Sequence, residues 1–317
     1  MFFPYRKEHL PVRTIPRRPT PAAPDTRGPA RPRVFMLQWR MRPSAGSLVI
    51  FVSSLVVLVL AAGAISGLVA LLASPPATDA LGSLSSNAWW FIYRPATDAA
   101  ADAAPWRIGA AVAGALLALL GVARARTFYR RTPSPVIPFL MLFLLTLGLE
   151  CLRAGTALLT AVNGSVSLSV FLTRVIYWGR FTGLLGLLAA GLYGLELKYP
   201  RVMVLGGVVM LVAFAMAAYI PVDRTVFLAQ LTWKLGDEQS VWFLNLALAA
   251  LAVLTGVVSA LVHRGRRTAL LAAGVALFII AREAEFFALA PLPLAAGLAA
   301  QAAGTVLCLG SFAMAEV

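Results

Sequence analysis

The chain has 317 residues, of which 60% are hydrophobic and 13% charged, and its formal net charge is +14 at pH 7. This composition excludes an ordinary soluble domain and is typical of a protein with several membrane-spanning helices. About eight spans would use nearly the whole length, so we expect no room for a soluble catalytic domain.

The N-terminal tail, residues 1–46, contains ten Lys/Arg, two acidic residues and nine prolines. A segment of this composition cannot bury a core, so we expect it to be disordered in the cytoplasm and to contact anionic lipid. Docking of a cytoplasmic protein partner is the alternative. Nucleic-acid binding is disfavoured because no stacking aromatic residues alternate with the arginines.

The apolar run at 47–73 is predicted to be a signal-anchor helix, because the tail before it is far too long for a signal peptide. Residues 74–106 are expected to form a short extracytoplasmic segment. Its aromatic run from Trp89 to Tyr93 is predicted to lie at the outer membrane interface.

Residues 107–317 are predicted to form a seven-helix membrane bundle. Hydropathy places its spans at about 107–123, 136–161, 168–196, 202–220, 241–262, 268–289 and 294–313. The connection at 221–240 includes an amphipathic stretch, Val226–Leu235, expected to lie in the plane of the interface. The predicted fold class is therefore an all-α polytopic bundle of about eight transmembrane helices.

The distribution of charge predicts the orientation in the membrane. With both termini in the cytoplasm, the inner segments carry 19 Lys/Arg, whereas Asp and Glu predominate in the outer segments. This asymmetry follows the positive-inside rule. We therefore expect a multi-pass protein of the cell membrane, most simply a bacterial inner membrane.

Several charged residues lie within the predicted spans, although a charge at mid-bilayer costs at least about 2.5 kcal/mol on insertion scales. Such residues are usually paired, exposed to water in a cavity, or functional. Counting from the span ends places Glu196 at the inner interface and the others in the middle-to-outer part of the membrane. These other candidate site residues are Glu150, Arg153, Arg174, Arg180, Arg282, Glu283 and Glu285.

Spacing predicts how these charges pair. Glu150 and Arg153 are i,i+3, as are Arg282 and Glu285, so each pair can meet on one helix face. Glu283 points elsewhere, and Arg174 or Arg180 of another helix is its expected partner. The four cations and three anions leave one arginine in excess.

Three interpretations of this cluster remain open. The pairs can fix the packing of the spans at 136–161, 168–196 and 268–289. They can instead line a water-accessible pocket that opens outward, in which the excess arginine binds a small anion or a carboxylate-bearing ligand bidentately. In the third interpretation, Glu150 or Glu283 gains and loses a proton.

Small residues recur along the span at 168–196, where they allow neighbouring helices to approach closely. They are Gly179, Gly183, Gly186, Ala190 and Gly194. We expect this span to be a central, tightly packed helix.

The sequence offers little support for a cofactor or for catalysis. Cys151 and Cys308 lie in apolar segments, and the two histidines, His9 and His263, lie outside the predicted spans, so we expect no disulfide framework, metal or haem. No lysine lies in a span, which argues against a retinal Schiff base. Walker, HExxH and intramembrane GxSxG motifs are missing, so we expect no enzyme activity.

The layout of one anchor helix, a short outer segment and seven helices resembles that of bacterial seven-helix sensory modules. The resemblance implies a ligand-sensing or signal-coupling module that acts through a separate protein partner. The alternatives are a small transporter of an anionic solute or protons, and a non-catalytic accessory subunit of a membrane complex.

Overall fold

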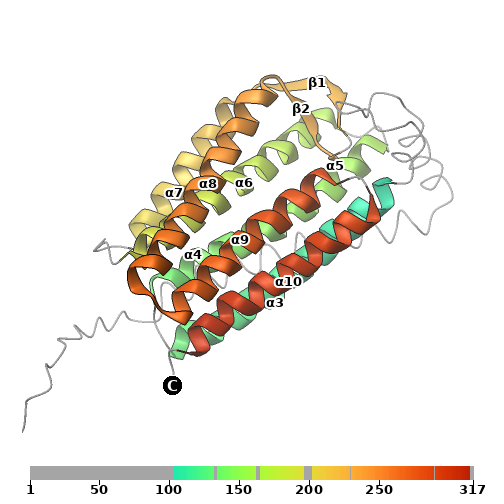
Figure 1. Cartoon of the computed structure of the whole chain (residues 1–317). Coiled ribbons are helices and arrows are strands. Elements are labelled where there is room, and N and C mark those ends of the chain that lie inside the picture. The colour runs from blue at the N-terminus through green and yellow to red at the C-terminus, as the bar shows by residue number, and fades with distance from the viewer. Residues whose placement is uncertain are drawn as a thin grey trace, which may run out of the picture. The chain divides into compact units, whose positions relative to one another are not determined.

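The structure is a computed structural model of the chain, shown in Figure 1. It describes residues 103–131, 134–161, 165–195, 202–228, 230–288 and 290–314. The predicted tail at 1–46, the predicted anchor helix at 47–73 and most of the predicted outer segment at 74–106 lie outside the described residues, as does Glu196.

Helices cover each span that the sequence predicts between residues 107 and 313. They are α3 (Ala103–Arg131), α4 (Val136–Gly148), α5 (Leu152–Ala161), α6 (Val166–Gly194), α7 (Val202–Tyr219), α8 (Glu238–His263), α9 (Arg266–Phe287) and α10 (Pro291–Ala313). A short 3₁₀ turn, η2 (Leu149–Cys151), joins α4 to α5. The span predicted at 136–161 therefore consists of two α-helices connected directly by this turn.

Within the described residues, five helical segments are long and apolar enough to cross a membrane. They are Trp106–Arg131, Val136–Thr160, Val166–Gly194, Glu238–His263 and Pro291–Ala313. The apolar part of α7, Val204–Tyr219, is shorter. The last turns of α9 carry Arg282, Glu283 and Glu285, which lower its hydropathy.

Local capping interactions explain where two of these helices begin. The side chain of Ser165 accepts a hydrogen bond from Leu168 N at the start of α6, and Asp237 accepts one from Ser240 N at the start of α8. Hydrogen bonds from the side chain and the backbone of Ser240 also lower the pKa of the Asp237 carboxyl group. Pro291 opens α10, where its missing N–H is not needed.

Helix α6 packs against α4, α5, α7 and α8, as the small residues along it predict. A Cβ atom on Gly179 would lie 3.3 Å from the Leu149 side chain, and one on Gly191 would lie 2.2 Å from Thr255 Oγ1. Helices α9 and α10 form an extensive antiparallel pair, and α3 lies beside α10 and also contacts α4 (Figure 1).

The connection between α7 and α8 is a β-hairpin and not an amphipathic helix. That the stretch at Val226–Leu235 lies in the membrane interface stays a prediction. Strand β1 (Val222–Phe227) pairs antiparallel with β2 (Trp233–Leu235). Burial alternates along β2, because Trp233 and Leu235 are buried and Lys234 is partly exposed. This two-residue period belongs to a strand, although a short segment of this kind also fits an amphipathic helix. The all-α expectation therefore holds for the bundle and fails at this hairpin.

Large apolar side chains are exposed on the outer faces of several helices. They include Leu120 on α3, Val204, Leu211 and Phe214 on α7, Phe243, Leu254 and Leu261 on α8, and Leu292 and Val306 on α10. Extended exposed apolar surfaces of this kind are rare on monomeric soluble proteins.

The close contact between α9 and α10 predicts a different effect for two glycine substitutions. A Cβ atom on Gly274 would lie 2.5 Å from Cys308 Sγ and 3.0 Å from Gly304 O, so Gly274→Ala should cost about 1–3 kcal/mol of stability through overpacking. Gly207 on α7 has nothing within 4 Å of such an atom. Gly207→Ala should be neutral or stabilising by up to about 1 kcal/mol, because alanine favours the helix.

Thermal unfolding of both variants in detergent micelles measures the difference. Equal stability of Gly274→Ala and Gly207→Ala would contradict the close packing of α9 on α10.

Candidate functional site

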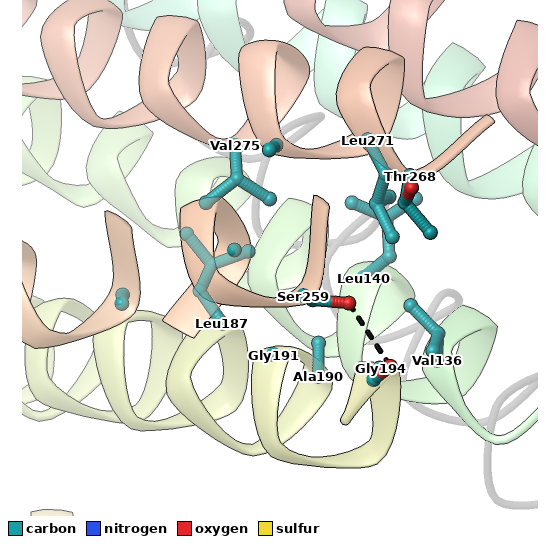
Figure 2. A pocket seen from close by; sticks show the side chains of 13 residues that line it. Val136, Leu140, Leu187, Ala190, Gly191, Gly194, Ser259, Thr268, Leu271 and Val275 are labelled. Carbon is teal, nitrogen blue, oxygen red and sulfur yellow. Dashed lines mark hydrogen bonds between the residues drawn. The ribbon is translucent and has the colours of Figure 1, made fainter. Parts of the chain in front are cut away.

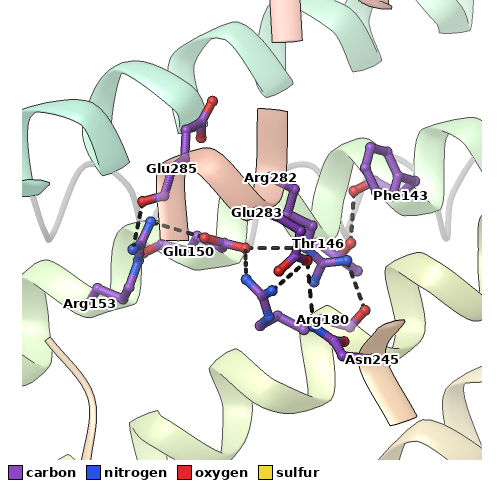
Figure 3. Close-up of polar contacts among 9 residues, drawn as sticks. All are labelled: Phe143, Thr146, Glu150, Arg153, Arg180, Asn245, Arg282, Glu283 and Glu285. Atoms are coloured by element: carbon purple, nitrogen blue, oxygen red, sulfur yellow. Dashed lines mark hydrogen bonds and ion pairs between the residues drawn. The ribbon is translucent and has the colours of Figure 1, made fainter. Parts of the chain in front are cut away.

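The centre of the bundle holds a buried carboxylate that contacts three arginines from three different helical segments (Figure 3). Glu150 Oε1 lies 3.3 Å from Arg180 Nη1 and 3.2 Å from Arg282 Nε. Glu150 Oε2 lies 2.9 Å from Arg153 Nη2, which confirms the predicted i,i+3 pair. The carboxylate thus links η2 and α5 to α6 and α9. We call Glu150, Arg153, Arg180, Arg282 and Glu283 the ion-pair cluster.

The position of Glu150 in the 3₁₀ turn between α4 and α5 contributes to this geometry. Such turns are more tightly wound than an α-helix, and within a helix they often mark a functional or strained segment. Arg153 Nε also donates to Glu150 O, at 3.3 Å, so the arginine is bonded to both the backbone and the side chain of the same residue.

Arg180 is the residue that joins the two carboxylates of the ion-pair cluster. Its Nη2 lies 2.6 Å from Glu283 Oε1, and Asn245 Nδ2 on α8 donates to the same oxygen at 3.5 Å. Glu283 therefore has the partner on another helix that the sequence predicts. Its side chain is 33% exposed, whereas that of Glu150 is 4% exposed, so the cluster has one accessible carboxylate.

Arg282 crosses from α9 to α6 through a gap that Gly183 leaves open. Arg282 Nη1 donates to Arg180 O at 2.8 Å. A Cβ atom on Gly183 would lie 2.9 Å from that nitrogen and 2.5 Å from Thr146 Oγ1. The other terminal nitrogen, Arg282 Nη2, is buried and has no hydrogen-bond partner in the described part of the chain.

Aromatic rings cover the guanidinium groups. The Cζ atom of Arg180 lies 3.9 Å from the centroid of the Phe286 ring, and that of Arg153 lies 5.2 Å from the same centroid. The ring of Phe143 lies 5.8 Å from Arg282 Cζ. These contacts add cation–π attraction and keep water away from the ion pairs.

Two candidate residues do not join the ion-pair cluster. Arg174 is exposed and has no ion pair among the described residues. It lies six positions before Arg180, which turns it to a different face of α6. The predicted pairing of Arg282 with Glu285 is not formed either, since Arg282 bonds to Glu150 instead. The Glu285 carboxylate points away (Figure 3), and only its backbone oxygen bonds to the cluster, accepting from Arg153 Nη1 at 3.2 Å.

Arg107 is a buried arginine near the site that the sequence analysis did not single out. Its side chain is 2% exposed, and its Nη2 donates to Phe287 O at 3.1 Å and to Ala288 O. It thereby satisfies carbonyl groups at the C-terminus of α9, where a cation is favourable. The sequence did not single it out, because a residue at the first position of a predicted span is usually an ordinary arginine at the membrane interface.

The β-hairpin covers the end of the bundle that lies nearest the ion-pair cluster. Thr156 Oγ1 on α5 donates to Leu231 O in the hairpin turn. Trp233 Nε1 donates to Ser169 Oγ at 2.8 Å, and Trp233 N donates to Thr173 Oγ1 at 3.3 Å. The hairpin is therefore held on the first turns of α6, on the Glu283 side of the bundle.

A small apolar cavity of about 20 Å³ lies at the opposite end, between α4, α6, α8 and α9 (Figure 2). Ser259 Oγ donates to Gly194 O beside it, at 2.9 Å. The remaining lining is mostly aliphatic and glycine, so this cavity has room for one water-sized molecule but few groups to hold it.

The described residues contain no group of three or more His, Cys, Asp and Glu side chains arranged to hold a metal ion. No family model matches the chain, and no curated protein or solved structure is significantly similar to it.

Substitutions on α6 and in η2 test the ion-pair cluster. Glu150→Gln leaves Arg153 and Arg282 without a carboxylate partner and should cost about 3–5 kcal/mol. Arg174→Gln, the matched control on α6, should change stability by less than about 0.5 kcal/mol because Arg174 is exposed. The free energy of unfolding in bicelles, measured by steric trapping, separates the two variants. A Glu150→Gln protein as stable as Arg174→Gln would show that the cluster is not formed.

Proposed function

We propose that this chain is a multi-pass protein of the cell membrane, with both termini in the cytoplasm. Five described helical segments are long and apolar enough to cross a bilayer. The exposed apolar side chains of α7, α8 and α10 suit contact with lipid acyl chains. Basic residues at helix ends, such as Arg130 and Arg131 in the last turn of α3 and Arg266 and Arg267 in the first turn of α9, suit the cytoplasmic side.

Within that membrane protein, we propose a ligand-sensing or signal-coupling module whose ligand is a small anion or a carboxylate-bearing molecule. The contact between Arg180 and Glu283 carries this proposal. Arg180 is buried, but the carboxylate it binds is one-third exposed and is the accessible member of the ion-pair cluster. A ligand carboxylate can replace Glu283 on the planar guanidinium fork, with Phe286 stacked on the same group.

The ion-pair cluster supplies a route by which such an exchange would affect other helices. Arg180 also binds Glu150, and Glu150 binds Arg153 and Arg282. A ligand that draws Arg180 away from Glu150 changes the charge balance on α5 and α9 together. Arg180 thus has two alternative sets of partners, which is the bistable element that coupling requires. A separate protein would receive the signal.

Two alternatives have some support. Each arginine of the ion-pair cluster has at least two polar contacts, which suits a packing role in an accessory subunit of a membrane complex. The buried carboxylates of Glu150 and Glu285, together with the partly exposed Glu283, also suit a small transporter of protons or of an anionic solute. Enzymatic activity is not part of the proposal.

Native mass spectrometry of the protein extracted with its own lipids tests the ligand-sensing proposal. The protein should carry one small anion per chain. Arg180→Lys keeps the positive charge for Glu150 and Glu283 but loses the bidentate fork, so it should reduce occupancy at least tenfold. Glu283→Gln removes the competing carboxylate and should increase occupancy.

Arg174→Lys is the matched control on α6 and should leave occupancy unchanged. A protein partner bound in stoichiometric amount, with no small anion in any variant, would contradict the proposal and favour the accessory-subunit alternative.

A further inference from the structure

The side chains of Glu285 on α9 and Gln301 on α10 approach the same glycine of α3. Both residues are buried, with exposed fractions of 5% and 1%. A Cβ atom on Gly114 of α3 would lie 2.9 Å from Glu285 Oε2 and 3.3 Å from Gln301 Oε1. The glycine therefore leaves room for the carboxylate and the amide on the same side of α3.

The orientation of the Gln301 amide is fixed by its other hydrogen bond. Gln301 Nε2 donates to Gly114 O at 3.0 Å. A flipped amide would place Gln301 Oε1 against Gly114 O, and two carbonyl oxygens repel each other. Nε2 therefore keeps its hydrogen bond to Gly114 O, and Oε1 lies on the Glu285 side. Among the described residues, neither Gln301 Oε1 nor Glu285 Oε1 has a hydrogen-bond partner. A buried acceptor without a donor costs about 1–3 kcal/mol. Each of these two neighbouring side chains therefore has one buried acceptor that lacks a donor.

The charged groups around Glu285 do not supply that donor. Arg282, on the same helix, bonds to Glu150 and to a backbone oxygen of α6, and its remaining nitrogen, Nη2, makes no hydrogen bond to Glu285. Arg153 bonds to Glu150 and reaches only the backbone oxygen of Glu285. Arg107 of α3 donates to carbonyl groups at the end of α9. Glu150 is itself an anion, which makes a second negative charge nearby unfavourable.

We propose that Glu285 and Gln301 form a proton-binding site, in which the protonated carboxyl group of Glu285 donates a hydrogen bond to Gln301 Oε1. One proton supplies the missing donor and removes a buried charge that has no ion pair within the described helices. The proton comes from water and returns to it, and no other bond changes. The site is separate from the anion site proposed at Arg180 and does not depend on it.

Proton occupancy at this site is coupled to the ion-pair cluster. When Glu285 is neutral, the three arginines of the cluster are shared between Glu150 and Glu283. When the proton leaves, a third carboxylate carries a negative charge beside Arg153 and Arg282 and competes with Glu150 for them. The site thus gives the bundle a way to respond to pH that does not need histidine.

Infrared spectroscopy of the full chain in lipid nanodiscs tests this proposal. At neutral pH, the wild-type protein should show the carbonyl band of a protonated carboxylic acid, and the band should disappear as the pH is raised. Glu285→Gln should abolish the band, whereas Glu283→Gln, two residues away on the same helix, should retain it. A neutral-pH spectrum without this band, or a band that persists in Glu285→Gln, would overturn the proposal.

A second variant keeps the test decisive if Glu285→Gln fails to fold. Gln301→Met has a similar volume but no acceptor, so the Glu285 band should remain and shift to higher frequency as the carboxyl group loses its hydrogen bond. An unshifted band in folded Gln301→Met would overturn the assignment of Gln301 as the acceptor.

Discussion

The three arginines of the ion-pair cluster are almost completely removed from solvent, and a buried guanidinium group is tolerated only when carboxylates and carbonyl groups surround it. Glu150 meets most of this requirement, because Arg153, Arg180 and Arg282 all contact its carboxylate. Each arginine comes from a different helix, so the ion pairs also fix how α5, α6 and α9 lie relative to one another. Gly183 is part of the same constraint, since a larger residue there would block Arg282.

Much of the helical bundle could be predicted from hydropathy, because each predicted span between residues 107 and 313 contains a helix. Two features could not. The 3₁₀ turn at Leu149–Cys151 contains Glu150 in an otherwise apolar run, and a change of hydrogen-bonding pattern there leaves no mark in composition. The segment around Trp233 is short and alternating, so its pattern fits both a strand and an amphipathic helix; the bonds from Trp233 to Ser169 and Thr173 help hold it in place.

The sequence predicts which charged residues form the candidate site, but it predicts only some of the pairs that they make. Spacing along the chain predicted the pair of Glu150 with Arg153 correctly, because the two residues are three positions apart in adjoining helical segments. The same rule failed for Arg282 and Glu285, since contacts with other helices determine which neighbour each side chain reaches. Arg174 and Arg180 were both candidates for Glu283, and the rotation of α6 turns only Arg180 toward it. Gln301 and Asn245 look like ordinary helix-contact residues until their neighbours are known.

The central claim is that Glu150 interacts directly with arginines on other helices, and a double-mutant cycle measures this most directly. The unfolding free energies of wild type, Glu150→Gln, Arg282→Gln and the double variant give the coupling energy of the pair. A coupling energy above about 1 kcal/mol is predicted, because both side chains are buried and in contact. Additive effects of the two substitutions would contradict the account.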